Sequence, residues 1–171
     1  MKLLSLLNNI DYEGCADDRD ILYITHDSRK VKKGTLFIAI YGENNDGHDF
    51  IFEAIDNGAI AVVANGRAPV TNKVPIIQVK NPRETMSRIA SNFFNNPSKY
   101  LKIIGITGTN GKTTTTQIID HILKYNNLSC SSLGTLGFNS PSGIISTGFT
   151  TPESIELQQI LYTLKKGGVN Y

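Results

Sequence analysis

The stretch "ITGTNGKTTTT", residues 106–116, constrains this chain more than any other feature of its sequence. It follows the apolar run "LKII" and leads into a segment with the spacing of an amphipathic helix. Glycines before a Lys-Thr pair, between a strand and a helix, are typical of a phosphate-binding loop. The usual pattern G-x-x-x-x-G-K-[ST] requires a glycine at position 106, where Ile106 stands. The loop is therefore either a nucleotide site with a shorter glycine spacing or an ordinary Thr/Gly-rich turn.

The residue types in this loop favour the nucleotide site. Glycines let the backbone come close to phosphate oxygens, and the following helix adds its positive N-terminal end. Lys112 would neutralise charge on the transferring phosphoryl group, and the hydroxyl of Thr113 would ligate Mg²⁺. Four successive threonines are poor helix formers, so an ordinary turn would gain little from them. The expected contacts to ATP are Gly108, Thr109, Asn110, Gly111, Lys112, Thr113 and Thr114.

Composition excludes several other classes of protein. Hydrophobic residues make up 40% of the 171 residues, which argues against disorder, and the net charge of +2 gives no reason to expect a nucleic-acid partner. The apolar runs are too short to span a bilayer, and the start of the chain is a poor secretory signal. Cys15 and Cys130 form no C-x-x-C pair, so we expect two free thiols in a reducing cytoplasm, with a disulfide as the alternative.

Residues 1–98 predict a small α/β domain. Runs at 21–27 and 35–40 have the composition of strands, and residues 50–58 then change to helical spacing with Gly58 as the stop. Two more buried strands are predicted at 60–65 and 74–79. A helix should begin at Pro82 and end at the Asn-Asn-Pro of residues 95–97.

Residues 99–171 predict the start of a second domain. A strand is expected at 100–106, before the glycine loop, and a helix at 112–126 with apolar residues on its inner face. The last helix should have Thr151 as its cap and Pro152 as its first residue. This order indicates a parallel α/β unit, yet two parallel strands cannot bury both faces of a sheet. We therefore expect a truncated P-loop, parallel-sheet ATPase domain. The inner face of the first helix comprises Ile118, Ile119, Ile122 and Leu123.

The loop "GITGTNGKTTTT" resembles the ATP loop of the Mur ligases, which add amino acids to the cell-wall precursor. Folylpolyglutamate synthetases carry a similar loop. The Mur ligase family uses the short spacing G-T-N-G-K-T, which gives Gly108 the role of the early glycine and assigns Ile106 to the strand. The stretch from His26 to Val63, containing "DSR" and "YGENNDGHDF", is also similar to the N-terminal domain of two members of this family.

This resemblance implies where the substrate binds. The first domain would hold its uridine diphosphate (UDP) end through Ser28, with His26 nearby, and through the uracil loop Glu43, Asn44 and Asn45. "GTLGF" and "TTPESIEL" resemble the member that adds the third residue, in which Thr150 and Thr151 would contact the muramoyl-dipeptide. His48 belongs to the same pattern, but a role at a helix start or in packing is expected for it rather than catalysis.

The activity implied is ATP- and Mg²⁺-dependent amide ligation. L-lysine or meso-diaminopimelate would be added to UDP-N-acetylmuramoyl-L-alanyl-D-glutamate through an acyl phosphate, by a cytoplasmic monomer with no nucleic-acid or membrane partner. The resemblance covers well under half of a complete member, so these 171 residues alone are expected not to ligate. The alternatives are a non-catalytic module that binds a UDP-sugar or nucleotide, and the Mur ligase that adds the terminal dipeptide.

Overall fold

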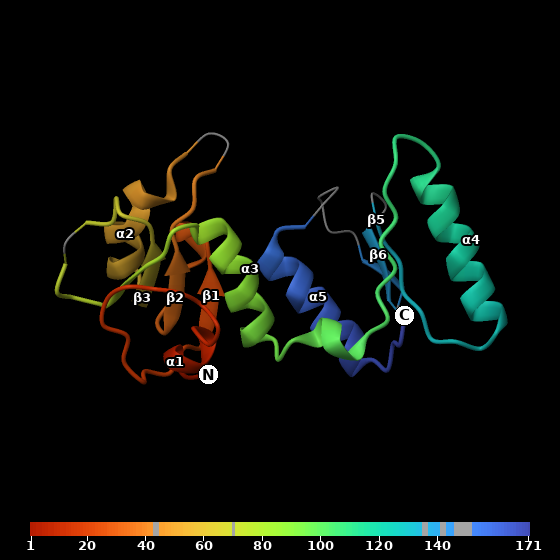
Figure 1. Ribbon diagram of the computed structural model, residues 1–171, viewed down its shortest axis with the longest axis horizontal. Coiled ribbons are helices and arrows are strands. Elements are labelled where there is room, and N and C mark those ends of the chain that lie inside the picture. Colours follow the sequence, from red (N-terminus) through yellow and green to blue (C-terminus); the bar gives the residue numbers. More distant parts are fainter. Residues whose placement is uncertain (43–44, 70, 135–136, 141–142, 146–151) are drawn as a thin grey trace. The chain divides into compact units, whose positions relative to one another are not determined.

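The computed structural model describes residues 1–42, 45–69, 71–134, 137–140, 143–145 and 152–171 (Figure 1). The chain divides into two compact units, Met1–Phe93 and Phe94–Tyr171. Each unit is described separately below. The α/β class with a parallel sheet, predicted from the sequence, is confirmed.

The first unit is built on a four-stranded parallel sheet in the order β1-β2-β3-β4. All four strands lie within runs predicted from the sequence, allowing for one residue at the start of β3. Because the strands are parallel and consecutive, all of their carboxyl ends meet at one edge of the sheet. The strands are β1 (Tyr23–Thr25), β2 (Thr35–Ile38), β3 (Ala59–Ala64) and β4 (Ile76–Gln78).

Helices cover both faces of this sheet, as a parallel sheet requires. On one face, α2 (Ile51–Asp56) packs its apolar side against Phe37 of β2 and Val62 of β3, in a fully buried cluster. Side chains alternate along a strand, so the neighbours of these two residues point to the opposite face. There α1 (Leu3–Leu6) and α3 (Pro82–Phe93) contribute their buried residues, and the strands lie between α2 and α3 (Figure 1).

The helix limits in this unit follow the predicted signals. α3 begins at Pro82, and the chain after it turns through Asn95 and Asn96, whose φ angles are 60° and 49°. α2 ends at Asp56 and is followed by Gly58 at φ 108°. Two short 3-10 helices, η1 (Ser28–Lys30) and η2 (Gly47–Phe50), follow β1 and β2.

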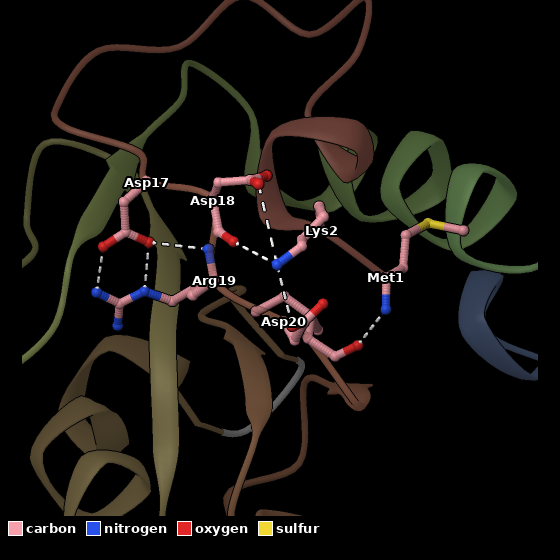
Figure 2. A network of polar contacts seen from close by, with 7 residues as sticks. Met1, Lys2, Asp17, Asp18, Arg19 and Asp20 are labelled. Carbon is pink, nitrogen blue, oxygen red and sulfur yellow. Dashed lines mark hydrogen bonds and ion pairs between the residues drawn. The ribbon is translucent and has the colours of Figure 1, made fainter.

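A polar network fastens the segment that leads into β1 (Figure 2). The ammonium group of Lys2 lies 3.0 Å from a carboxylate oxygen of Asp20 and 3.9 Å from one of Asp18. Asp17 accepts two hydrogen bonds from the guanidinium of Arg19, which also donates to the carbonyl oxygen of Ile60 in β3. The terminal amine of Met1 donates to the carbonyl oxygen of Ile21 at 2.8 Å. These contacts join the N-terminus to the sheet.

The second unit contains two long helices and a small antiparallel sheet. The helices are α4 (Lys112–Tyr125) and α5 (Ser154–Lys166), with the 3-10 helix η3 (Pro97–Tyr100) before them. The sheet has the order β5-β6-β7, formed by β5 (Leu133–Gly134), β6 (Gly137–Ser140) and β7 (Gly143–Ile145).

The strand predicted at 100–106 is wrong, because residues 101–108 lie outside every strand. A strand exists only when a neighbour pairs with it, and no parallel partner occurs among the described residues of this unit. The inner face predicted for α4 is likewise not buried. Ile118 and Ile122 are 54% and 53% exposed, while Ile119 and Leu123 are half-buried.

The predicted start of the last helix is also wrong. α5 begins at Ser154 with Glu153 as its N-cap residue, and Pro152 lies outside the helix. Thr151 lies outside the described residues. The spacing of this segment predicts Ile155, Ile160, Leu161 and Leu164 on its inward face. Ile155, Ile160 and Leu164 are buried as predicted, whereas Leu161 is half-buried. The hydrophobic spacing therefore located the helix correctly, although the Thr-Pro signal placed its start too early.

Both cysteines are free thiols, as predicted: Cys15 is exposed, and Cys130 is half-buried. Burial, followed by the nearby Asp120 carboxylate, raises the pKa of the Cys130 thiol. No helix in the described part of the chain is both long enough and apolar enough to cross a bilayer.

Gly58 provides a test of the first unit. Its φ is +108°, and an added Cβ would lie 2.8 Å from the backbone nitrogen of Lys33. Gly58→Ala should therefore lower the free energy of unfolding by about 2 kcal/mol, since it combines backbone strain with a clash. Gly66→Ala is the matched control, because its Cβ would meet nothing within 4 Å. Equal urea midpoints for the two variants would contradict this packing.

Candidate functional site

The candidate substrate residues of the first unit lie at the carboxyl edge of its parallel sheet. His26 and Ser28 directly follow β1, and Asn45 lies in the connection that follows β2. Since β1 and β2 are adjacent and parallel, these connections leave the sheet side by side. Open α/β sheets bind ligands outside the carboxyl ends of their strands. The predicted residues are therefore placed where such a fold can form a site.

Ser28 is the first residue of η1, and it is 9% exposed. The cap of this short helix is supplied by Asp27, whose carboxylate accepts a hydrogen bond of 3.1 Å from the backbone N–H of Arg29. The same carboxylate accepts two bonds of 2.9 Å from the Arg29 guanidinium. The "DSR" triplet therefore caps a helix start through Asp27, and Ser28 itself supplies no cap.

His26 has an unused polar atom. Its Nδ1 is buried and has no hydrogen-bond partner among the described residues. A buried imidazole nitrogen without a partner is unfavourable by about 1–3 kcal/mol. A ligand or a water molecule at this edge of the sheet would provide the missing partner.

The uracil loop predicted from the sequence is only partly described. Glu43 and Asn44 lie outside the described residues. Asn45 is described, and its carbonyl oxygen accepts a hydrogen bond of 2.9 Å from the N–H of Gly42. An antiparallel bridge between Tyr41 and Asp46 encloses this pair. Backbone contacts therefore hold the described residues on the two sides of this loop together.

The glycine loop of the second unit has the backbone geometry that a phosphate site needs. Gly108 and Gly111 have φ angles of 149° and 79°, which side-chain-bearing residues rarely adopt. Gly111 is the N-cap residue of α4 and provides no capping side chain. The Thr115 N–H donates to the carbonyl oxygen of Gly111 at 2.9 Å. The N–H groups earlier in this turn have no acceptor within the helix, so the 14-residue helix begins with donors open to an anion.

Lys112 lies over this loop. Its ammonium nitrogen donates to the carbonyl oxygens of Gly108, at 2.5 Å, and Thr109, at 3.2 Å. The positive charge is thus already held next to the open N–H groups of α4. This arrangement brings the predicted glycines and lysine together on one arc of backbone.

The donor set fits a nucleotide polyphosphate with its metal ion. Backbone N–H groups and an ammonium suit phosphate oxygens, and the exposed Thr113 hydroxyl, in the first turn of α4, is a hard oxygen ligand of the kind that Mg²⁺ accepts. Gly108 to Thr114 would hold the phosphates. The described residues include no cluster of three His, Cys, Asp or Glu side chains suited to a metal ion.

A hollow of about 350 Å³ lies beside this loop, but it is not the phosphate site. Its lining is mainly apolar, includes Ile104, Ile106, Leu123 and Leu157, and contains no residue from 107–115. It marks the space between the segment 101–106, α4 and α5. Thr150 and Thr151, the predicted contacts to the muramoyl-dipeptide, lie outside the described residues.

These features define a class of protein: an α/β protein with a glycine turn of the P-loop type before a helix, and a parallel sheet with the candidate polar residues at its carboxyl edge. Comparison with known families gives a match at residues 106–171 to "Mur ligase middle domain". Residues 20–94 match "Mur ligase family, catalytic domain". The chain belongs to the Mur ligase family, as its loop and its "DSR" region predicted.

Curated relatives match along almost the whole chain. A UDP-N-acetylmuramoyl-L-alanyl-D-glutamate–2,6-diaminopimelate ligase of Caldanaerobacter subterraneus is 41% identical over 172 residues, covering 100% of this chain and 36% of the relative. The ligase of the same name from Alkaliphilus metalliredigens is 44% identical, covering 94% of this chain and 33% of the relative. The chain therefore spans about a third of the length of the curated relatives it matches.

Solved structures agree on the fold. A structure named for a UDP-N-acetylmuramoyl-L-alanyl-D-glutamate–2,6-diaminopimelate ligase has a TM-score of 0.78 and 25% identity, covering 99% of this chain and 34% of that one. MurF from Acinetobacter baumannii has a TM-score of 0.63 at 21% identity, covering 97% of this chain and 33% of that one. The latter likeness concerns the fold alone.

The pair Asp27–Arg29 gives a pH-dependent prediction for the edge of β1. Hydrogen bonds from the Arg29 guanidinium hold the pKa of Asp27 below its ordinary value of 3.8. A carboxyl group with a lowered pKa stabilises the fold above that value, and its contribution is lost as the pH falls through the folded pKa. Asp27→Asn should therefore lower the urea midpoint at pH 7, and the difference from wild type should disappear on acidification. Circular dichroism would follow the unfolding. An undiminished difference at the lowest pH where both proteins fold would contradict the pairing.

Proposed function

We propose that this chain is the N-terminal part of an ATP-dependent acid–amino-acid ligase of peptidoglycan precursor synthesis. The full protein adds the third residue to UDP-N-acetylmuramoyl-L-alanyl-D-glutamate. The observation that carries the proposal is the arc from Gly108 to Lys112, which places two glycines and an ammonium at an uncapped helix start. Membership of the Mur ligase family and the names of the relatives support the choice of substrate.

The names of the relatives also indicate which amino acid is added. Both curated relatives described above are named for 2,6-diaminopimelate, so we take this diamino acid rather than lysine as the second substrate. The dipeptide-adding ligase is represented by MurF structures that show the fold alone, at 21% identity. We further propose that the protein works as a monomer in the cytoplasm.

In this proposal, the two units bind different ligands. The first unit holds the UDP end of the substrate at the carboxyl edge of its sheet, where Ser28 and His26 follow β1 and Asn45 follows β2. The second unit is the beginning of the middle domain and holds ATP. The chain spans about a third of the length of its relatives, and the task that we propose for these residues is binding.

The chemistry proposed for the second unit is electrostatic. ATP supplies the phosphoryl group that converts the D-glutamyl carboxylate into an acyl phosphate, from which the amine of the diamino acid displaces phosphate. Lys112 and the N–H groups at the start of α4 offset negative charge on the transferring group. Thr113, in the first turn of the same helix, would supply an oxygen ligand to Mg²⁺. Positioning and charge stabilisation are the contributions that we propose for this loop.

Binding of UDP tests the role of the first unit. Ser28→Ala should weaken UDP binding to this chain about five- to ten-fold, as expected for a lost hydrogen bond of about 1 kcal/mol. Isothermal titration calorimetry would measure the affinity. Ser5→Ala, at an exposed position of α1, is the matched control and should bind like wild type. Unaltered UDP affinity in Ser28→Ala would remove this residue from the site.

Nucleotide binding tests the role of the second unit. In the protein extended to the length of its relatives, Lys112→Ala should weaken Mg-ATP binding at least about ten-fold. The reason is that the phosphates lose a charge-assisted contact with the Lys112 ammonium. Lys124→Ala removes a lysine from the other end of α4, where it pairs with Asp120 at 2.6 Å, and serves as the control. If both variants bind Mg-ATP like wild type, the loop is an ordinary turn, and a UDP-binding module without catalysis becomes the better function.

A further inference from the structure

We propose that the segment following Tyr171 in the full-length protein runs as a parallel strand between residues 102–106 and residues 130–133. The space between these two stretches is called the C-terminal slot below. The inference rests on one part of the proposed function, namely that this chain is the N-terminal part of a longer protein. It goes beyond that function because it names the segment that completes the second unit and the backbone groups that bind it.

The last residues of the chain already lie at the entrance of the C-terminal slot (Figure 1). On one side, the Tyr171 N–H donates to the carbonyl oxygen of Ser129 at 3.2 Å, and the Ser131 N–H donates to that of Tyr171 at 3.0 Å. On the other side, the Lys102 N–H donates to the carbonyl oxygen of Asn170 at 2.8 Å. Bonds on both sides are typical of a central strand, although two residues are too few to form one.

These bonds fix a parallel register. In a parallel pair, a residue donates to and accepts from the two residues that flank its partner. Tyr171 bonds in this way to the residues on either side of Cys130. The bond from Lys102 to Asn170 is the first half of the same pattern with Lys102 as the flanked residue's partner on the opposite side. Its second half would be a bond from the N–H of the residue after Tyr171 to the Lys102 carbonyl oxygen.

Side chains hold the end of the chain in this position. Val169 is 3% exposed and belongs to a buried cluster with Ile160 and Leu164 of α5. The Lys102 ammonium nitrogen lies 3.0 Å from the hydroxyl oxygen of Tyr171 and 4.9 Å from its ring centroid. The direction in which the chain continues is therefore set by packing as well as by backbone bonds.

Both sides of the C-terminal slot have backbone groups that a further strand could bind. Within the ranges that the structure describes, residues 103–106 make no hydrogen bond to other backbone groups. On the opposite side, β5 is the end strand of the sheet β5-β6-β7, so its outer edge is open. Such rows of N–H and C=O groups are the places where another strand adds to a sheet. One added strand would satisfy both rows.

The side chains around the slot indicate the chemistry of the segment. The hollow of about 350 Å³ described above is lined by both sides of the slot and by apolar residues of α4 and α5. Ile103 and Ile104 are 59% and 53% exposed, and neighbouring residues of an extended chain face opposite sides. Both faces of an inserted strand would therefore meet apolar side chains. The segment should be a continuous run of about five apolar residues, mainly β-branched.

A second copy of this chain fits the slot less well than the continuing segment. Asn170 and Tyr171 occupy the entrance and are bonded on both sides. A strand from another molecule would have to start directly beyond Tyr171, in line with it and in the same direction. The segment that is covalently joined to Tyr171 meets these conditions without any ordering of a second molecule.

Amide hydrogen exchange in the full-length protein, measured without nucleotide or substrate, gives the main test. The register predicts that the N–H groups of Ile104 and Leu133 donate to the first and second residues after Tyr171. Each should exchange at least about a hundred-fold more slowly in the full-length protein than in the 171-residue chain. The amide of Gly34, which donates to Gly58 in the first unit, is the control and should not change. Equal rates for Ile104 in the two proteins would overturn the proposal.

A substitution tests whether the segment covers the side chain of Ile104. Ile104→Asn should leave the melting temperature of the 171-residue chain unchanged, because this side chain is largely exposed there. In the full-length protein it should lower the melting temperature by at least about 3 °C, since a polar group is then buried. Leu22→Asn, at a position of the first unit that is 57% exposed, is the control and should act equally on both proteins. A full-length protein as insensitive to Ile104→Asn as the 171-residue chain would contradict the proposal.

Ligase activity separates failure of this inference from failure of the proposed function. Slow exchange at Ile104 and Leu133 in a full-length protein that makes no ligated product would reject the function and retain the strand. An active ligase in which both amides exchange as fast as in the 171-residue chain would reject the strand and retain the function. Slow exchange only in a dimer of the 171-residue chain, detected by analytical ultracentrifugation, would assign the slot to a second copy and overturn the proposal.

Discussion

This structure depends on one requirement: both faces of a parallel sheet must be packed against other elements. Parallel strands are joined by crossovers that place other elements on their faces, and they are stable where both faces are buried. The first unit meets this requirement with α2 on one face and α1 and α3 on the other. Because its four strands are parallel, their carboxyl ends lie at one edge of the sheet, and the candidate substrate residues lie at that edge. In the second unit no described strand pairs in parallel, and Ile103 and Ile104 are 59% and 53% exposed.

The two candidate sites use different parts of the backbone. At the sheet edge, side chains such as those of His26 and Ser28 would define the proposed site through the direction of their polar groups, which suits a nucleotide and its substituents. At the start of α4, glycine backbone and the open end of a helix define a site through charge, which suits phosphates whatever their attachment. The proposed ligase takes two nucleotide ligands, the UDP end of its substrate and ATP, and each kind of recognition would serve one of them.

Single residues in the sequence correctly predicted those helix starts and ends that depend on the backbone sterics of the residue itself. Pro82 at the start of α3, the Asn-Asn-Pro that ends it and Gly58 after α2 each restrict the backbone of their own residue, so their effects were predictable. The strand at 100–106 was predicted wrongly because strand formation depends on a partner elsewhere in the chain. The helix-start or packing role expected for His48 is confirmed by its burial in η2. Its bond from the N–H of Asn65 could not be predicted, because the two residues are distant in sequence.

The lysine of the glycine loop makes contacts in the free protein that a bound nucleotide would have to replace. In the free protein its ammonium already holds the carbonyl oxygens of Gly108 and Thr109. At the proposed site, an incoming triphosphate would take a cation away from its partners in the main chain. Any affinity measured at this loop is therefore the difference between two sets of contacts. The carbonyls released in the exchange become acceptors that water or the bound ligand must then satisfy.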